Sequence, residues 1–269
     1  MDGRVIVVTS GKGGVGKTTT TANLGMALSN LGKKVALIDA DIGLRNLDLV
    51  LGLENRIVYD IVDVVEEKCK LKQALIKDKR QPNLALLPAA QTRDKSAVTP
   101  EQMIEVCNEL KKEFDIIIID CPAGIEQGFK NAIAAATESI IVTNPEVSSI
   151  RDADRIIGLL DSVDHEMIPP KLIVNRIRME MVKENEMLNV DDVKEILGID
   201  LLGVVPDDES IITSTNKGIP AVMLDNSLAG QALKDIARRL LGENVPFMDL
   251  TKDNNTGIFS FFKKLFAKS

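Results

Sequence analysis

The chain has 269 residues, of which 45% are hydrophobic and 27% charged, and its formal net charge at pH 7 is −7. These values are ordinary for a globular protein of one large or two small domains. The acidic balance disfavours a broad nucleic-acid-binding surface, and no stretch approaches the ~18 apolar residues needed to span a membrane.

Cysteine and histidine offer little support for a metal centre. Cys69, Cys107 and Cys121 lack the CxxC spacing of metal sites, and their odd number disfavours a disulfide scaffold. We expect reduced thiols in an intracellular protein, because the N-terminus MDGRVIVVTSGKGG reads as a strand rather than a signal peptide. His165 lies in the turn-like segment VDHEMIPPK, and we expect it to be structural or solvated.

Short runs rich in Val and Ile recur along the chain and alternate with amphipathic segments. Their nearly continuous hydrophobicity is typical of strands buried on both faces of a parallel sheet. The predicted strands are Val5–Thr9, Val35–Asp39, Leu84–Pro88, Ile116–Asp120, Ile140–Thr143, Leu172–Asn175 and Leu201–Val205. The predicted helices include Thr18–Leu31, Pro100–Phe114, Ile150–Val163 and Leu228–Leu241. We therefore predict a single α/β domain, residues 1–242, with a mainly parallel sheet covered by helices on both faces.

The first predicted strand leads directly into the glycine-rich stretch GKGGVGKT. This stretch satisfies GxxxxGK[ST] between a strand and a helix start, which is the setting of a phosphate-binding P-loop. Glycines let backbone N–H groups converge on phosphate oxygens, and Lys17 and Thr18 are suited to the terminal phosphates and to Mg²⁺. The predicted nucleotide-binding residues here are Gly11, Lys12, Gly13, Gly14, Val15, Gly16, Lys17, Thr18 and Thr19.

Carboxylates follow two predicted strands at the edge where a parallel sheet binds ligands. VALIDAD contains Asp39 and Asp41, and FDIIIID ends in Asp120. An isolated aspartate in this position often caps the following turn. Beside a P-loop, a hydrophobic run ending in aspartate is the Walker B pattern, so Asp120 joins Thr18 in the predicted Mg²⁺ site.

A second lysine, Lys12, gives the loop the form KGGxGK[ST]. This form is similar to that of the deviant Walker A ATPases, the MinD/ParA family of P-loop proteins. The resemblance implies that Lys12 reaches across a nucleotide-sandwich homodimer and supplies transition-state charge to the partner's phosphates. It also implies that Asp41 is the third residue of the Mg²⁺ site, with Thr18 and Asp120, and that it positions the attacking water. Lys12, Lys17 and Asp41 are thus the predicted catalytic residues of an Mg²⁺-dependent ATPase activated by dimerisation.

The same resemblance places the adenine base beside the ends of the last two predicted strands. The residues concerned are Asn175, Arg176, Pro206, Asp207 and Asp208. From its chemistry alone, the Asn175 side chain is equally suited to hydrogen-bonding a backbone turn, and that alternative stays open. The absence of an NKxD guanine-binding pattern from the sequence favours ATP as the nucleotide.

Residues 39–65, DADIGLRNLDLVLGLENRIVYDIVDVV, resemble the branch of this family that selects the cell-division site. The likeness continues from VTSGKGGVGKTT through IIDCPAGIEQGFKNAI to the tail. It implies that an ATP dimer on the cytoplasmic face of the membrane recruits the septum inhibitor MinC, and that hydrolysis releases the dimer into the cytoplasm. Asp152 is the predicted partner-contact residue. The sequence leaves open whether a MinE-like activator or another polarity factor controls hydrolysis.

The C-terminal stretch TGIFSFFKKLFAKS contains four of the seven phenylalanines in the chain. On a helical wheel its apolar side chains fall within an arc of roughly 160°, with lysines opposite, as in helices that lie in an anionic membrane interface. We predict a flexible linker over 243–256 and an amphipathic membrane-targeting helix over 257–269. The predicted membrane residues are Ile258, Phe259, Phe261, Phe262, Lys263, Lys264, Leu265, Phe266 and Lys268. A helix packed on its own domain or on a protein partner is the alternative.

A different function is also compatible with these motifs. A ParA-like partition ATPase or a flagellum-positioning ATPase would carry the same P-loop but act on DNA or on a protein scaffold. The three tail lysines contribute +3 to the net charge of −7, which leaves −10 on the remainder of the chain. This charge makes DNA an unfavourable partner.

Overall fold

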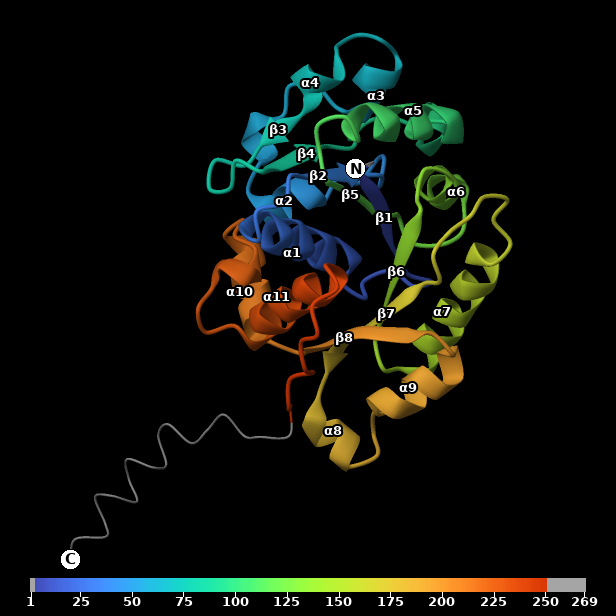
Figure 1. Cartoon of the computed structure of the whole chain (residues 1–269), viewed down its shortest axis with the longest axis vertical. Coiled ribbons are helices and arrows are strands. Elements are labelled where there is room, and N and C mark those ends of the chain that lie inside the picture. Colours follow the sequence, from blue (N-terminus) through green and yellow to red (C-terminus); the bar gives the residue numbers. More distant parts are fainter. Residues whose placement is uncertain (1–2, 251–269) are drawn as a thin grey trace, which may run out of the picture.

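Eight strands within residues 3–250, the part of the chain described by the computed structural model, form one sheet (Figure 1). Their spatial order is β3-β4-β2-β5-β1-β6-β7-β8. The strands are β1 (Arg4–Thr9), β2 (Val35–Asp39), β3 (Ile76–Lys77), β4 (Leu84–Leu87), β5 (Ile116–Asp120), β6 (Glu138–Thr143), β7 (Lys171–Ile177) and β8 (Asp200–Pro206). Neighbouring strands pair in parallel except for β3 and β4, which pair antiparallel. The prediction of a mainly parallel sheet is confirmed.

Helices cover both faces of this sheet (Figure 1). The α-helices in the described range are α1 (Lys17–Asn30), α2 (Leu47–Leu51), α3 (Ile61–Val65), α4 (Leu71–Ala74), α5 (Pro100–Leu110), α6 (Gln127–Ala134), α7 (Val147–Leu160), α8 (Met179–Lys183), α9 (Val190–Leu197), α10 (Glu209–Asn216) and α11 (Leu228–Leu240). Helices α1, α2 and α11 pack on one face, and α5, α6, α7 and α9 pack on the other.

Alternate side chains of each strand enter two separate cores. On β1, Val5 and Val7 join the core beneath α5–α7, whereas Ile6 and Val8 join the core beneath α1 and α11. Every residue of β2 and β5 is buried. This two-sided burial explains why the strands appear in the sequence as continuous apolar runs.

All seven predicted strands are present, with shifts of a few residues at their ends. The four predicted helices are also present, although α7 begins at Val147 and α5 ends at Leu110, three and four residues earlier than expected. Strand β3 and the short helices were not predicted. Most of these elements have four to eight residues, which is too short for a periodic pattern to stand out.

The order of the strands determines where a ligand can bind. After β1 the chain passes to β2 and β4 on one side, returns to β5 beside β1, and continues through β6, β7 and β8 on the other side. Connections therefore diverge at the carboxyl end of β1, and such a switch point is the usual ligand-binding position of an open parallel sheet. The glycine-rich loop lies at this point, between β1 and α1.

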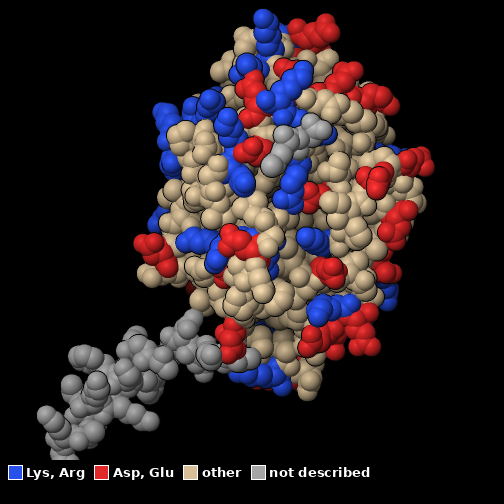
Figure 2. All heavy atoms as spheres, in the orientation of Figure 1, with Lys and Arg blue, Asp and Glu red and all other residues tan. Residues whose placement is uncertain are grey.

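Charged side chains of both signs are distributed over the face seen in Figure 2, with acidic residues prominent along its right edge. Residues 243–250, the first part of the predicted linker, are described and contact the body through Arg239. The rest of the predicted linker and the predicted membrane helix 257–269 lie outside the described residues. None of the helices within residues 3–250 is long and apolar enough to cross a bilayer.

Two helical glycines provide a test of the packing between α1 and the sheet. A Cβ atom at Gly25 would lie 2.7 Å from Leu37 Cδ2, inside the core, whereas one at Gly158 on α7 would meet nothing within 4 Å. Gly25→Ala is therefore expected to lower the free energy of unfolding by about 1–3 kcal/mol through overpacking. Gly158→Ala is the matched control and should raise it by about 0.5–1 kcal/mol. Urea denaturation measures both, and equal effects would contradict the packing described here.

Candidate functional site

The glycine-rich loop forms a cradle between the end of β1 and the first turn of α1. Gly14 and Gly16 have φ angles of 77° and 100°, a left-handed conformation that glycine adopts at low cost. Lys17 is buried, and its Nζ donates a hydrogen bond of 2.8 Å to Ser10 Oγ. Burial lowers the pKa of Lys17, against the opposing effect of the Asp120 charge. The loop thus places the Lys17 ammonium group beside its backbone N–H groups, which is the arrangement with which a P-loop binds phosphate.

Asp120 lies at the carboxyl end of β5, directly beside the first turn of α1. Its carboxylate accepts hydrogen bonds from Thr18 Oγ1 at 2.6 Å and from Thr21 Oγ1 at 3.3 Å. In the strand pairing it is opposite Asp39 on β2. Burial, followed by the charge of Asp39, raises the pKa of Asp120 to about 7. The positive charge that the protein itself places near Asp39 and Asp120 is therefore too small to keep both carboxylates fully ionised at neutral pH.

The oxygen donors at this edge fit a magnesium ion that is shared with a bound phosphate. Thr18 and Asp120 supply a hydroxyl and a carboxylate that already lie in contact. Within residues 3–250, no group of three His, Cys, Asp or Glu side chains is arranged to hold a metal. Mg²⁺ is commonly held by one or two protein oxygens together with phosphate oxygens and water. Bound there, the ion would neutralise phosphate charge and relieve the charge deficit around Asp120.

The two aspartates after β2 have different environments. Asp39 is buried and accepts three backbone N–H bonds, from Asp41 at 3.0 Å and from Asn46 and Leu47 at 3.1 Å. It therefore holds the loop between β2 and α2, although burial raises its pKa to about 6. Asp41 is half-buried, and burial raises its pKa against the opposing charges of Lys95 and Lys17. Asp41 is thus the carboxylate of this pair that is placed to act on a ligand.

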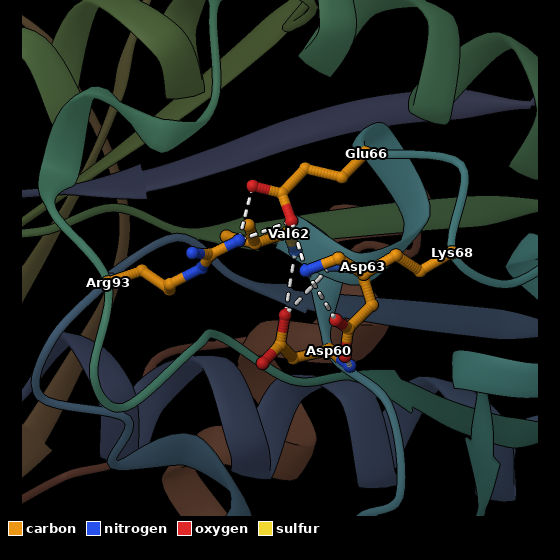
Figure 3. Close-up of polar contacts among 6 residues, drawn as sticks. All are labelled: Asp60, Val62, Asp63, Glu66, Lys68 and Arg93. Atoms are coloured by element: carbon orange, nitrogen blue, oxygen red, sulfur yellow. Dashed lines mark hydrogen bonds and ion pairs between the residues drawn. The ribbon is translucent and has the colours of Figure 1, made fainter.

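Lys95 belongs to this site but was not predicted from the sequence. It follows β4, and its positive charge lowers the pKa of Asp41 against the effect of burial. Arg93, two residues earlier, forms an ion pair with Glu66, the residue that follows α3 (Figure 3). Lys68 contacts the same Glu66 carboxylate at 2.5 Å. Two basic side chains, one of them from the loop that contains Lys95, thus share the Glu66 carboxylate.

Lys12 points away from its own loop, towards the start of α7. Its Nζ lies 3.3 Å from Glu146 Oε2 and 3.2 Å from Ser148 Oγ. The side chains of Lys12 and Glu146 are 43% and 49% exposed, and an ion pair in that setting contributes only about 0–1 kcal/mol. A Cβ atom at Gly11 would lie 2.2 Å from the backbone oxygen of Asp152. The P-loop is therefore in direct contact with the helix that carries the predicted partner residue.

A cavity of about 950 Å³ opens beside the P-loop at the ends of β7 and β8. The predicted nucleotide-binding residues that line it are Gly16, Thr19, Asn175, Arg176, Pro206, Asp207 and Asp208. Apolar side chains of α10 and α11, such as Ile211 and Leu233, line it as well. These residues come from distant parts of the sequence, and together they enclose a space suited to a base next to the phosphate loop.

Several polar groups of this cavity already have partners in the protein. Asn175 Nδ2 donates a hydrogen bond of 2.7 Å to the Val15 carbonyl, which is the backbone contact that the sequence left open. Asp207 accepts a hydrogen bond of 2.7 Å from Arg178 Nε. Asp208 caps α10 and binds Ser227 Oγ at 2.9 Å. In this structure Asn175 therefore hydrogen-bonds the backbone of the P-loop.

The structure brings most of the predicted residues to one edge of the sheet. The P-loop, Asp41 and Asp120 lie together at this edge, and the base cavity adjoins them. Asp152 lies on α7, where its backbone contacts the loop at Gly11. The predicted membrane residues lie outside the described range. The residues that sequence reasoning missed are Ser10, Thr21, Lys95, Glu146 and Ser148. Thr21 carried one usable signal, because it follows Thr18 by three residues on the same face of α1.

Comparison with known proteins agrees with this geometry. Residues 6–221 match the model of the CobQ/CobB/MinD/ParA nucleotide-binding domain. The chain is 61% identical over 254 residues to the septum site-determining protein MinD of Synechocystis sp., covering 94% of this chain and 95% of that one.

Two solved structures are also similar. A MinC:MinD cell-division complex of Aquifex aeolicus aligns with a TM-score of 0.85 at 52% identity, covering 91% of this chain and 99% of that one. MinD of Pyrococcus horikoshii complexed with Mg-ADP aligns with a TM-score of 0.80 at 32% identity, covering 90% and 99%.

The buried carboxylates predict how stability depends on pH when nucleotide and metal are absent. Asp120 has a raised pKa, so the folded protein holds a proton that the unfolded chain releases near its ordinary value of 3.8. The free energy of unfolding should therefore fall as the pH rises towards about 7 and then level off. Asp39 contributes to this fall in the free energy of unfolding mainly below about pH 6.

Denaturation of the wild type and of Asp120→Asn in EDTA, at pH values from 5 to 8, checks this expectation. The variant should lose the slope between about pH 6 and 7 while keeping the part below pH 6 that comes from Asp39. An unchanged slope in the variant would show that Asp120 does not carry the buried proton.

Proposed function

The chain belongs to the CobQ/CobB/MinD/ParA nucleotide-binding family, within its MinD group, and we propose that it is a membrane-associating switch ATPase of cell-division site selection. One observation carries this proposal. Lys17, Thr18, Asp41 and Asp120 converge at the switch point of the sheet, beside a cavity large enough for a base. Phosphoryl transfer needs positioning and charge neutralisation more than covalent help, and this arrangement supplies both.

The residues of one protomer would divide the work as follows. Backbone N–H groups of the P-loop and the Lys17 ammonium bind the β- and γ-phosphates of ATP, and Thr18 and Asp120 hold Mg²⁺ against them. The ion supplies charge neutralisation when bound. Asp41 accepts a hydrogen bond from the attacking water and orients it towards the γ-phosphate, with Lys95 balancing its charge.

The Lys12 side chain is turned towards Glu146 and Ser148 at the start of α7. We propose that Lys12 acts on the nucleotide of a second copy in an ATP-dependent homodimer. The exposed contact with Glu146 costs little to break. A cation delivered in trans is worth about 10³–10⁵ in turnover in related phosphoryl-transfer enzymes, so dimerisation would switch hydrolysis on.

The proposed protein partners follow from the relatives. The Aquifex aeolicus neighbour was solved as a MinC:MinD complex, and we propose a septum inhibitor of the MinC type as cargo. Asp152 is half-buried on α7, and its backbone touches the P-loop at Gly11. A partner that binds this helix would therefore sense the state of the loop. Hydrolysis would be stimulated by a MinE-like activator or localised by another polarity factor.

The tail sequence accounts for reversible binding to an anionic membrane. Six large apolar side chains give at most roughly 9–18 kcal/mol if fully buried, whereas ordering some eleven residues costs about 1–2 kcal/mol apiece. One tail should therefore hold weakly, and two tails on one dimer gain about 10²–10⁴ in avidity. The protein would thus cycle between the cytoplasm and the cytoplasmic face of the membrane.

A ParA-like partition or flagellum-positioning ATPase remains the second candidate function. Such a protein would share the P-loop, the lysine in trans and the dimer. On the face seen in Figure 2, Lys and Arg side chains gather over the upper left part but are interspersed with acidic ones, and the net charge of the chain is −7. We therefore favour the membrane over DNA as the surface on which the dimer acts.

Co-sedimentation with vesicles that contain anionic lipid tests the proposed function. We expect the full chain to pellet with Mg-ATP at least tenfold more than with Mg-ADP, because only the ATP dimer presents two tails. Two matched variants are informative: a chain ending at Asn255, and Phe261→Ser/Phe262→Ser in the full chain. Both should keep ATP turnover in solution but lose pelleting.

Two results would contradict this function. Equal pelleting with ATP and ADP would leave a membrane anchor but remove the switch. Retention on DNA in the ATP state that weakens steeply with salt, without retention on vesicles, would establish the partition function instead.

A further inference from the structure

Three residues that follow the last helix line the same cavity as the predicted base-binding residues. Met248, Asp249 and Leu250 belong to the cavity beside the P-loop, together with Asn175 and Pro206. The sequence places them in a linker, and none of the nucleotide-binding motifs includes them. The wall of the nucleotide site is therefore completed by the segment that leads towards the C-terminal tail.

Arg239 on α11 contacts this segment at several points. Arg239 on α11 donates from Nε to the Val245 carbonyl and from Nη2 to the Pro246 carbonyl, both at 2.8 Å. Its Nη1 also reaches the Leu202 carbonyl of β8 at 3.2 Å. The guanidinium lies over the Phe247 ring, 4.3 Å from its centroid. These contacts tie the segment to both the last helix and the last strand of the sheet.

Met248 extends from the clamped segment towards the body. It is half-buried and packs against the core cluster beneath α1 and α11, as does Ile211 of α10. Leu250 is also half-buried. A purine base presents two apolar faces and favours apolar walls with a few polar groups at its edge. Met248 and Leu250 supply apolar surface of that kind to the wall of the cavity.

We propose that residues 245–250 form a strap across the nucleotide site, in which Met248 and Leu250 contact the base and Arg239 positions them. This inference rests on the proposed nucleotide-binding function. It adds a second link between the nucleotide and the tail, because the strap is continuous with residues 251–269. Occupancy of the site then fixes the point at which the tail leaves the body within one protomer, before any dimer forms.

The test separates contacts to the base from contacts to the phosphates. Calorimetry with Mg-ADP and with Mg-pyrophosphate is carried out on full-length wild type, Met248→Ala and Arg239→Ala. We expect both variants to bind ADP about five- to thirtyfold more weakly, because apolar contact with the base is lost. Pyrophosphate affinity should stay within about twofold, because in this proposal Met248 and Leu250 contact the base and not the phosphates. A general folding defect would weaken both ligands.

Arg238→Ala is the matched control. Arg238 is the neighbouring residue on α11, and it pairs with Glu243 at 2.8 Å rather than with the strap carbonyls at 245 and 246. This variant should bind ADP like the wild type. A second measurement, hydrogen exchange of the peptide covering 243–250, should show slower exchange when ADP is added to the wild type and no slowing with pyrophosphate.

The outcomes distinguish the strap from the function on which it rests. ADP binding of wild-type strength in Met248→Ala and Arg239→Ala, or exchange of 243–250 that ADP leaves unchanged, would overturn the strap while nucleotide binding stands. Failure of the wild type to bind either ADP or pyrophosphate would overturn the nucleotide-binding function itself, and the strap with it.

Discussion

Buried charge at the carboxyl edge of the sheet is the constraint on which the rest of the structure depends. Lys17, Asp39 and Asp120 are all buried there, and the pKa values of all three are shifted towards their neutral forms, mainly by burial. Removing charges from water is costly unless they are paired and hydrogen-bonded. Nearby hydroxyls and backbone N–H groups hydrogen-bond these side chains, but the direction of the pKa shifts indicates that their charges are not fully compensated. A bound phosphate chain with Mg²⁺ would supply the compensating charges. The site therefore suits a ligand that carries both.

That constraint also explains why the site suits a switch. A ligand that stabilises the edge binds the folded state and adds to its stability by mass action. The loop that receives it touches α7 through Gly11 and Asp152, and Lys12 rests on the start of the same helix. The base cavity meets the strap that leads to the tail. The P-loop contact with α7, the Lys12 side chain and the segment before the tail therefore all adjoin the site at which we propose that nucleotide binds.

Local features of the sequence predicted much of this arrangement. The strands were predictable because burial on both faces leaves continuous apolar runs, and the P-loop was predictable because its chemistry lies within eight consecutive residues. Contacts between distant segments were not predictable from one sequence. Lys95 approaches Asp41 through a loop fixed by Arg93, Asn175 supports the Val15 carbonyl, and Arg239 holds the strap. Each of these contacts depends on which distant segments the fold brings together, and no local sequence motif indicates that arrangement.

If two protomers complete each other's nucleotide sites, two inactive variants should restore hydrolysis when they are mixed. Lys12→Ala removes the lysine given to the partner, and Asp41→Ala removes the carboxylate that orients water in the same protomer. Each variant alone should bind ATP but hydrolyse it slowly. In an equal mixture, only the mixed dimers join an intact Asp41 to a partner's Lys12, so phosphate release should recover to at most about a quarter of the wild-type rate. A mixture as inactive as its two components would contradict the claim and place Lys12 within its own site.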